Sequence, residues 1–295
     1  MQWLITGCST GLGLSLARAV ASRPGEKVIA TSRNPASSPE AVREITRNEN
    51  AVWETLDVSS HDLENQLSDI VAKHGPIDIL INNAGYAGGG VFEVTPVEVL
   101  REQFETNFFG VVRLMRAVVP EMRIGGKGGV IVNISSAVFY QAVPTASAYS
   151  SSKWALEGFS EAIASELAEF GIRVLLAEPG GMRTSFMDPS KVSKTTVPFP
   201  DSYKGTLAEY VWNTLQGMHG TQNLDPDRSA EAIVKEVLEP TIVKNADTGE
   251  TRKLLRLQLG KEAVDTMRKK IVTIESEAEL ILAKALACDF EAAGP

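Results

Sequence analysis

The chain has 295 residues, of which 43% are hydrophobic, so it can bury the core of one large α/β domain or of two small ones. Its net charge of −8, without any block rich in Lys and Arg, argues against a nucleic-acid partner. Because no run approaches the roughly 18 consecutive apolar residues of a membrane span, and the first apolar run is too short for a signal peptide, we expect a soluble, cytoplasmic protein.

Short apolar runs alternate with longer amphipathic stretches along the chain. Strands apolar on both faces and separated by helices are typical of a parallel sheet that is covered on both sides. We therefore predict a single domain over residues 1–295 with a doubly wound Rossmann fold, in which about seven parallel strands carry helices on both faces. The predicted strands are WLIT (3–6), KVIAT (27–31), AVWETL (51–56), DILI (78–81), GVIVNI (129–134), RVLLAE (173–178) and LLRLQLG (254–260), and the predicted helices include 12–22, 61–74 and 97–122, the last interrupted near its end by Pro120.

Two later segments break this rhythm. Residues 185–227 mix proline, serine, lysine and isolated aromatics without periodicity. Such an insertion is either disordered or functional, and its place after the sixth strand favours a substrate lid. Residues 261–288 form a predicted amphipathic helix, in which Val264, Met267, Ile271 and Ile274 recur at three-then-four spacing. We expect this helix to cover its own domain; a contact between subunits is the alternative.

A glycine-rich turn joins the first strand to the first helix. In TGCSTGLG (6–13), Gly7, Gly11 and Gly13 let the backbone approach a diphosphate, which the free N–H groups of the helix N-terminus can bind. The second strand ends in Ser32 and Arg33, where NAD-binding sites of this architecture commonly hold a carboxylate. Because a guanidinium can bind a 2′-phosphate, NADP(H) is favoured over NAD(H).

Tyr149 and Lys153 lie one helical turn apart in SAYSSSKWALEGF (147–159). A free phenol has a pKa of about 10, and a nearby ammonium together with a cationic nicotinamide would favour the phenolate and lower this pKa. The pair therefore suits acid/base chemistry at a carbonyl oxygen. The three histidines show no metal spacing and no G-x-S-x-G elbow is present, so neither a metal site nor a serine hydrolase is predicted.

With NNAG (82–85), TNFFG (106–110), NISS (133–136), YSSSK (149–153) and PGGMRT (179–184) following the glycine turn in order, residues 2–185 resemble the classical short-chain dehydrogenase/reductase family. The resemblance implies four catalytic residues. Tyr149 would be the acid/base, Lys153 its partner, Ser136 the group that orients the substrate oxygen, and Asn107 the anchor of a proton-relay water. The implied cofactor-binding residues are Gly7, Ser9, Thr10, Gly11, Leu12, Gly13, Ser32, Arg33, Asp57, Val58, Asn83, Ala84, Gly85, Tyr149, Lys153, Pro179, Gly180, Met182 and Thr184.

The chain departs from the family pattern after Ser136, where Phe139 stands at the position of a usual glycine. Phe139, Phe186 and Tyr203 are therefore predicted substrate-binding residues that favour a lipophilic carbonyl or alcohol. The expected function is NADP(H)-dependent interconversion of a ketone or aldehyde and its alcohol. A non-redox reaction such as epimerisation or cyclisation, and a non-catalytic cofactor-binding sensor, stay open. Relatives often pair through two long helices, here about 97–123 and 150–170, so a homodimer or homotetramer is expected.

Overall fold

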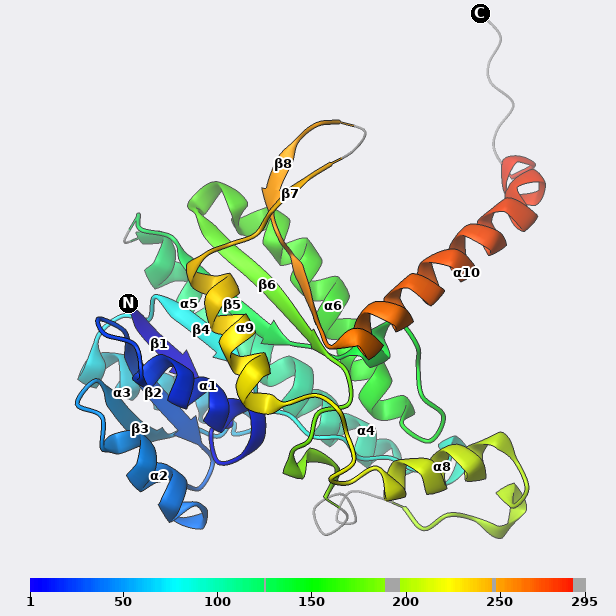
Figure 1. The fold of residues 1–295 in the computed structure, drawn as a ribbon, viewed down its shortest axis with the longest axis horizontal. Coiled ribbons are helices and arrows are strands. Elements are labelled where there is room, and N and C mark those ends of the chain that lie inside the picture. The colour runs from blue at the N-terminus through cyan, green and yellow to red at the C-terminus, as the bar shows by residue number, and fades with distance from the viewer. Residues whose placement is uncertain (125, 189–196, 246–247, 289–295) are drawn as a thin grey trace, which may run out of the picture.

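The computed structural model describes residues 1–124, 126–188, 197–245 and 248–288, and its central feature is a seven-stranded sheet (Figure 1). All six strand pairings are parallel. The order β3-β2-β1-β4-β5-β6-β9 places the change of winding direction between β1 and β4. This confirms the predicted doubly wound Rossmann fold. The strands are β1 (Gln2–Ile5), β2 (Lys27–Ser32), β3 (Ala51–Thr55), β4 (Ile79–Asn82), β5 (Gly129–Ile134), β6 (Ile172–Pro179) and β9 (Arg256–Leu259).

Helices cover both faces of the sheet, because successive strand residues point to opposite sides. Trp3 and Ile5 of β1 pack in one apolar cluster, and Leu4 between them packs in the other. The first cluster includes side chains of α1 (Gly11–Ala21), α2 (Pro39–Thr46) and α9 (Pro226–Leu238). The second includes side chains of α3 (Leu63–His74), α5 (Gly110–Ile124) and α6 (Ser147–Leu167).

The predicted helix 97–122 contains a wider turn. It consists of α4 (Val97–Phe104), the π-helical segment η3 (Glu105–Phe109) and α5, which continues through Pro120 to Ile124. Pro120 thus does not interrupt the helix near its end, as the sequence had suggested. A π turn accommodates one extra residue, and such turns often occur at functional sites.

The segment 185–227 is more regular than predicted. Residues 189–196 of the predicted lid lie outside the described residues, but η6 (Ser185–Met187), η8 (Asp201–Tyr203) and α8 (Leu207–Gly217) are helical. Leu207, Val211 and Leu215 recur every four residues and could have indicated α8. A short antiparallel pair, β7 (Ile242–Lys244) with β8 (Thr251–Lys253), was not predicted.

The C-terminal helix α10 (Lys261–Leu286) begins at the sheet and projects away from it (Figure 1). Ala263 is buried, but every residue from Ile271 to Cys288 is exposed. The prediction that this helix covers its own domain is therefore wrong over most of its length. Only its first turns reach β9 and the 3-10 turn η4 (Ala137–Phe139). No helix among the described residues is both long and apolar enough to cross a membrane.

Candidate active site

The glycine turn packs tightly against the ends of its neighbouring segments. Gly7 and Gly11 have φ values of +72° and +59°, which side chains other than glycine rarely adopt. A Cβ at Gly13 would collide with the carbonyl oxygen of Gly7 and the side chain of Asn83. Thr10 caps α1 in an extended conformation without a side-chain hydrogen bond to the helix, so the first N–H groups of α1 face the turn. This arrangement is a suitable cradle for a diphosphate.

The end of β4 is joined to this turn. The hydroxyl of Thr6 accepts hydrogen bonds from the backbone N–H groups of Asn83 and Ala84, both at 2.9 Å. The amide of Asn83 donates to the carbonyl oxygens of Thr6 at 2.8 Å and Gly7 at 3.2 Å. Asn83 therefore fixes the turn in place from the neighbouring strand. Thr6 was missed by sequence reasoning, although it precedes Gly7 directly.

At the end of β2, Ser32 is buried and its hydroxyl accepts a hydrogen bond from the indole of Trp53 at 3.1 Å. Arg33 is exposed, and among the described residues it makes no ion pair. The guanidinium thus lies at the carboxyl end of the sheet with its donors accessible. Such a group can bind a phosphate in forked geometry.

The loop after β3 brings Asp57 and Val58 to the same edge of the sheet. Asp57 accepts hydrogen bonds from the backbone N–H of Ser59 at 3.0 Å and from its hydroxyl at 2.7 Å. Val58 is buried, and its carbonyl oxygen accepts from Arg113 of α5 at 3.0 Å. These bonds fix the loop conformation, so Asp57, an implied cofactor-binding residue, is held at this edge of the sheet by local contacts.

Asn107 lies in the π turn and is fully buried. Its side-chain N–H group donates to the carbonyl oxygen of Tyr86 at 3.0 Å and to the hydroxyl of Ser152 at 3.1 Å. Its side-chain oxygen accepts from the backbone N–H of Tyr86 at 3.1 Å. A Cβ at Gly85 would lie 3.1 Å from that oxygen. Asn107 thus connects the segment after β4 to helix α6, which carries Tyr149 and Lys153.

Tyr149 and Lys153 lie on the same side of α6, as their spacing predicts. The ammonium of Lys153 lies 5.8 Å from the centroid of the Tyr149 ring and donates to the carbonyl oxygen of Ile134 at 2.8 Å. Lys153 is 6% exposed, whereas Tyr149 is half-buried. Ser136 follows β5 and its hydroxyl caps the turn η4. The site therefore gathers a phenol, an ammonium and a hydroxyl at the carboxyl end of β5.

Burial shifts the pKa values of both groups of this pair. Burial raises the pKa of Tyr149 to about 12, while a hydrogen bond with Ser136 opposes the rise. Burial also lowers the pKa of Lys153 to about 8, and the nearby carboxylate of Glu157 opposes that change. In the protein alone, desolvation of the phenolate thus outweighs the attraction of a cation held at Ile134, and the lowering expected from Lys153 together with a cationic nicotinamide stays a prediction.

The segment 179–184 crosses the glycine turn. A Cβ at Gly11 would lie 3.2 Å from Cβ of Thr184, and the hydroxyl of Ser185 donates to that of Thr10 at 3.1 Å. Met182 forms an isolated bridge with Leu224. The predicted residues Pro179, Gly180, Met182 and Thr184 therefore follow the carboxyl end of β6 toward the N-terminus of α1.

The three predicted substrate residues do not lie together. The ring of Phe186 lies 5.7 Å from that of Tyr149. Phe139 instead packs 5.1 Å from the ring of Trp154. Tyr203 packs 6.4 Å from Phe199. Among the ring contacts of the described residues, only that of Phe186 is with Tyr149, so Phe186 is the predicted substrate-binding residue whose ring lies beside the phenol.

Below the site lies a buried carboxyl pair that sequence reasoning missed. Glu157 and Glu178 are both fully buried, and burial raises the pKa of each carboxyl, which favours its protonated form. Nε of Arg256 lies 3.0 Å from Glu157 and 3.5 Å from Glu178. The signal was available in part: Tyr149, Lys153 and Glu157 recur every four residues, and Glu178 directly precedes Pro179.

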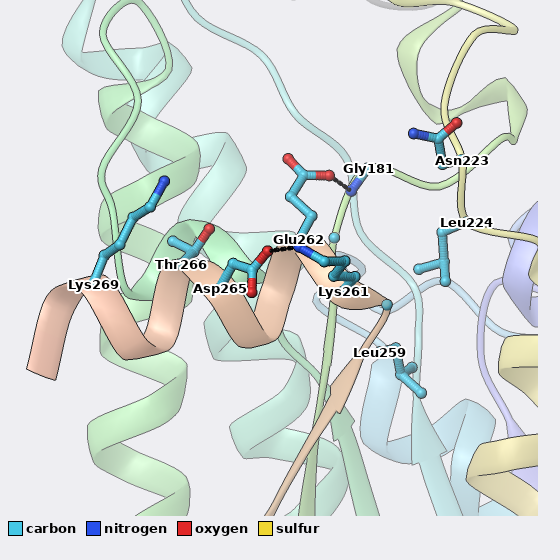
Figure 2. A pocket seen from close by; sticks show the side chains of 11 residues that line it. Gly181, Asn223, Leu224, Leu259, Lys261, Glu262, Asp265, Thr266 and Lys269 are labelled. Carbon is cyan, nitrogen blue, oxygen red and sulfur yellow. Dashed lines mark hydrogen bonds and ion pairs between the residues drawn. The ribbon is translucent and has the colours of Figure 1, made fainter.

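A cavity of about 540 Å³ opens beside Gly180 and Gly181, which follow β6 (Figure 2). It is lined by Gly180 and Gly181, by Asn223 and Leu224, and by the first turns of α10. Glu262 of α10 accepts a hydrogen bond from the N–H of Gly181 at 3.3 Å. The cavity therefore shares Gly180 with the predicted cofactor site, while α10 forms its opposite wall.

Residues 2–194 match the family model described as short chain dehydrogenase. The chain belongs to the short-chain dehydrogenase family. It is 38% identical over 235 residues to the uncharacterized oxidoreductase YusZ of Bacillus subtilis (strain 168), which covers 78% of this chain and 82% of that protein. It is 39% identical over 220 residues to a 3-ketodihydrosphingosine reductase of Bacteroides thetaiotaomicron, covering 73% of this chain and 78% of that protein.

The fold is likewise similar to solved short-chain dehydrogenases. One from Streptomyces avermitilis superposes with a TM-score of 0.79 at 33% identity, covering 98% of this chain and 99% of that chain. These findings confirm the family resemblance and the prediction of an oxidoreductase. The match to this solved structure thus also includes the segments beyond residue 194, such as α8, α9 and α10.

Proposed function

We propose that this short-chain dehydrogenase interconverts a lipophilic ketone or aldehyde and the corresponding alcohol with NADP(H), and that Tyr149 is the acid/base. The observation that carries the proposal is the joint placement of Tyr149, Lys153 and Ser136 at the carboxyl end of β5. The tight turn of Gly7, Gly11 and Gly13 fits a dinucleotide, since Gly7 and Gly11 have positive φ and a side chain at Gly13 would collide with the carbonyl oxygen of Gly7 and with Asn83.

Tyr149, Ser136 and Lys153 have separate roles in the proposed reaction. When bound at this turn, a nicotinamide dinucleotide supplies or accepts the hydride at the substrate carbon. Tyr149 is protonated at neutral pH because burial raises its pKa to about 12, so its phenol can donate a proton to the carbonyl oxygen. The hydroxyl of Ser136 can donate a hydrogen bond to the same oxygen as negative charge develops there. The ammonium of Lys153 then stabilises the phenolate that remains.

The cofactor preference rests on Ser32 and Arg33. Neither side chain repels a 2′-phosphate, and the accessible guanidinium can pair with it. The lipophilic substrate class is supported by Phe186 beside Tyr149 and by the 3-ketodihydrosphingosine reductase among the relatives, whose name designates a ketone with a long apolar chain.

The proposal also includes the association of the chain into oligomers and its location in the cytoplasm. Exposed apolar residues on the two long helical regions, such as Val97, Phe109 and Trp154, support association into a homodimer or homotetramer. The free thiols of Cys8 and Cys288 suit a reducing cytoplasm.

The test is turnover of a panel of long-chain and short ketones with NADPH, followed by the absorbance of the cofactor, for the wild type and Tyr149→Phe. We expect the variant to lose about 10²- to 10⁴-fold in kcat, while it still binds NADPH in a fluorescence titration. Tyr210→Phe, which changes an exposed tyrosine of α8, is the matched control and should keep full turnover. Full turnover of Tyr149→Phe would contradict the assignment of the acid/base.

A further inference from the structure

The projecting helix α10 carries an apolar stripe that its own domain leaves uncovered. Ile271, Ile274 and Ile281 are 45%, 51% and 54% exposed. Large apolar residues gathered on one exposed face mark an interaction surface more often than chance exposure does. The stripe lies on the part of the helix that stands away from the sheet in Figure 1.

The stripe follows a strict heptad pattern. Spacings of three and four residues alternate over three heptads, which is the pattern of a coiled-coil seam. Val272, Leu280 and Leu286 are exposed but lie outside this seam. The seam positions are Val264, Met267, Ile271, Ile274, Ala278, Ile281 and Ala285.

Charged residues flank the central part of the seam with opposite signs on the two sides of its midpoint, and Lys284 adds a basic residue near the end of α10. Arg268 and Lys270 stand beside the seam in the first half of α10, and Glu275 and Glu277 stand beside it in the second half. Heptad geometry places these residues at the e and g positions, which set partner choice and orientation in coiled coils. The helix is therefore complementary to a second copy of itself running in the opposite direction.

We propose that α10 is an assembly arm that pairs with α10 of a second copy as an antiparallel two-helix coiled coil. With the two-fold axis between Val272 and Thr273, Ile271 of one copy lies in the same layer as Ile274 of the other. Arg268 then faces Glu275 of the other copy, and Lys270 faces Glu277. The two-fold axis repeats each pair, as in any isologous interface.

The parallel arrangement is less complementary. In a parallel pair, g and e positions five residues apart face each other, so Lys270 still faces Glu275. Arg268, however, would face Ala263, and Glu277 would face Leu282. The antiparallel arrangement therefore pairs four of the five charged residues that flank the seam, whereas Lys284, the fifth, faces Ala263. The parallel arrangement pairs only Lys270 with Glu275 among these four.

The charge of the arm also argues against a lipid surface as its partner. Helices that lie on anionic membranes carry Lys and Arg across their polar face. In α10, acidic and basic side chains are equal in number, and three glutamates follow the seam through its central part. Two of these glutamates, Glu275 and Glu277, have basic partners in the antiparallel pair.

The decisive experiment is the molar mass from sedimentation equilibrium over a range of concentrations. We expect the wild type to have twice the mass of Ile271→Glu/Ile274→Glu, whether it goes from dimer to monomer or from tetramer to dimer. Because both residues are exposed in the single chain, the variant should keep its circular dichroism and unfolding temperature.

A charge swap tests the orientation. Arg268→Glu should raise the dissociation constant of the arm contact about tenfold, because it places Glu opposite Glu275 twice. Adding Glu275→Arg should restore it to within about threefold. In a parallel pair the same Glu275→Arg would face Lys270 and weaken association further, so failure of this rescue would overturn the antiparallel arrangement.

Two other outcomes would overturn the proposal altogether. One is an identical mass for the wild type and Ile271→Glu/Ile274→Glu. The other is a wild type of the lower mass that co-sediments with phosphatidylcholine/phosphatidylserine vesicles and loses this binding in the Ile271→Glu/Ile274→Glu variant, since the apolar stripe would then face lipid.

Discussion

At the scale of single residues, the most informative position is Arg33. It follows β2 directly, is exposed, and lies where a carboxylate would select the ribose hydroxyl of NAD. Its side chain is the group on which the proposed NADP(H) preference depends. The hydroxyl of Ser32 beside it accepts a hydrogen bond from the indole of Trp53, so Ser32 holds the end of the strand in place and contributes no charge.

Arg33→Ala should therefore change the cofactor preference selectively. We expect kcat/KM with NADPH to fall about 10- to 100-fold, because a charge-assisted, forked contact to the phosphate is lost. The value with NADH should change less than about threefold. Arg47→Ala, at the exposed C-terminal end of α2, is the control and should leave both values unchanged. An equal loss with the two cofactors would argue against a phosphate contact.

The environment of Lys153 could not be predicted from the spacing of the motif alone. The Tyr149–Lys153 spacing predicted the shared helix face correctly, but the pKa of each group depends on burial and on distant partners. The carbonyl of Ile134 and the carboxyl of Glu157, from β5 and from the next turn of α6, decide how the ammonium is held. No local pattern in the sequence states how deeply a side chain is buried, so the direction of both shifts required the structure.

At the scale of elements, the junction of α6, β6 and β9 contains the buried pair of Glu157 and Glu178. Burial raises the pKa of Glu178 to about 7, and the neighbouring Glu157 carboxylate adds to the rise. Burial likewise raises the pKa of Glu157. The folded protein thus keeps a proton on the pair at a pH where the unfolded chain, with ordinary glutamates, has released it.

This difference makes stability depend on pH in a defined direction. Between about pH 4.5 and pH 7 the folded state binds more protons than the unfolded state, so the contribution of the pair to the free energy of unfolding decreases as pH rises. Glu178→Gln removes the titration. We expect the variant to gain on the order of 2 kcal/mol relative to the wild type between pH 5 and pH 8, measured by urea unfolding.

Glu161→Gln provides the matched control for this prediction. Glu161 also pairs with Arg256, at 2.7 Å, but it is exposed, so its removal should leave the pH dependence of stability parallel to that of the wild type. A constant difference between Glu178→Gln and the wild type across this pH range would contradict the raised pKa of the pair.

The helix from Val97 to Ile124 shows a second limit of prediction at this scale. Its apolar period indicated one helix, and the boundaries were close to those observed. The π turn at Glu105–Phe109 was missed because a single extra residue hardly disturbs the period. What requires the turn is the burial of Asn107 against Tyr86 and Ser152, two contacts from segments far away in the chain.

At the scale of the whole molecule, the sheet was the most predictable part. Its strands are short apolar runs of the kind that a sheet covered on both faces contains, and all seven strands match the predicted ranges within two residues at either end. The last predicted strand, 254–260, was shortened to Arg256–Leu259. The glycine turn and the site residues followed because strand ends of a parallel sheet meet at one edge.

The outer elements were less predictable because their environment decides their form. Helix α8 has apolar residues at regular spacing yet buries none of them in the single chain. Helix α10 has a clear apolar stripe, and its sequence alone fits a cover over its own sheet as well as it fits an arm. Whether α10 covers the sheet or projects as an arm depends on the direction in which the chain leaves β9.

The two cysteines of the chain differ in exposure, which allows a distance between two copies to be measured. Cys8 is buried, which raises the pKa of its thiol to about 12, whereas Cys288 is exposed just beyond the tip of α10. A maleimide dye should therefore attach at one place per chain. Between two dyes in an antiparallel pair of arms, a helical rise of 1.5 Å per residue gives a separation of about 46 Å, against about 10 Å for arms lying parallel, so energy transfer between labelled copies would report their orientation in solution.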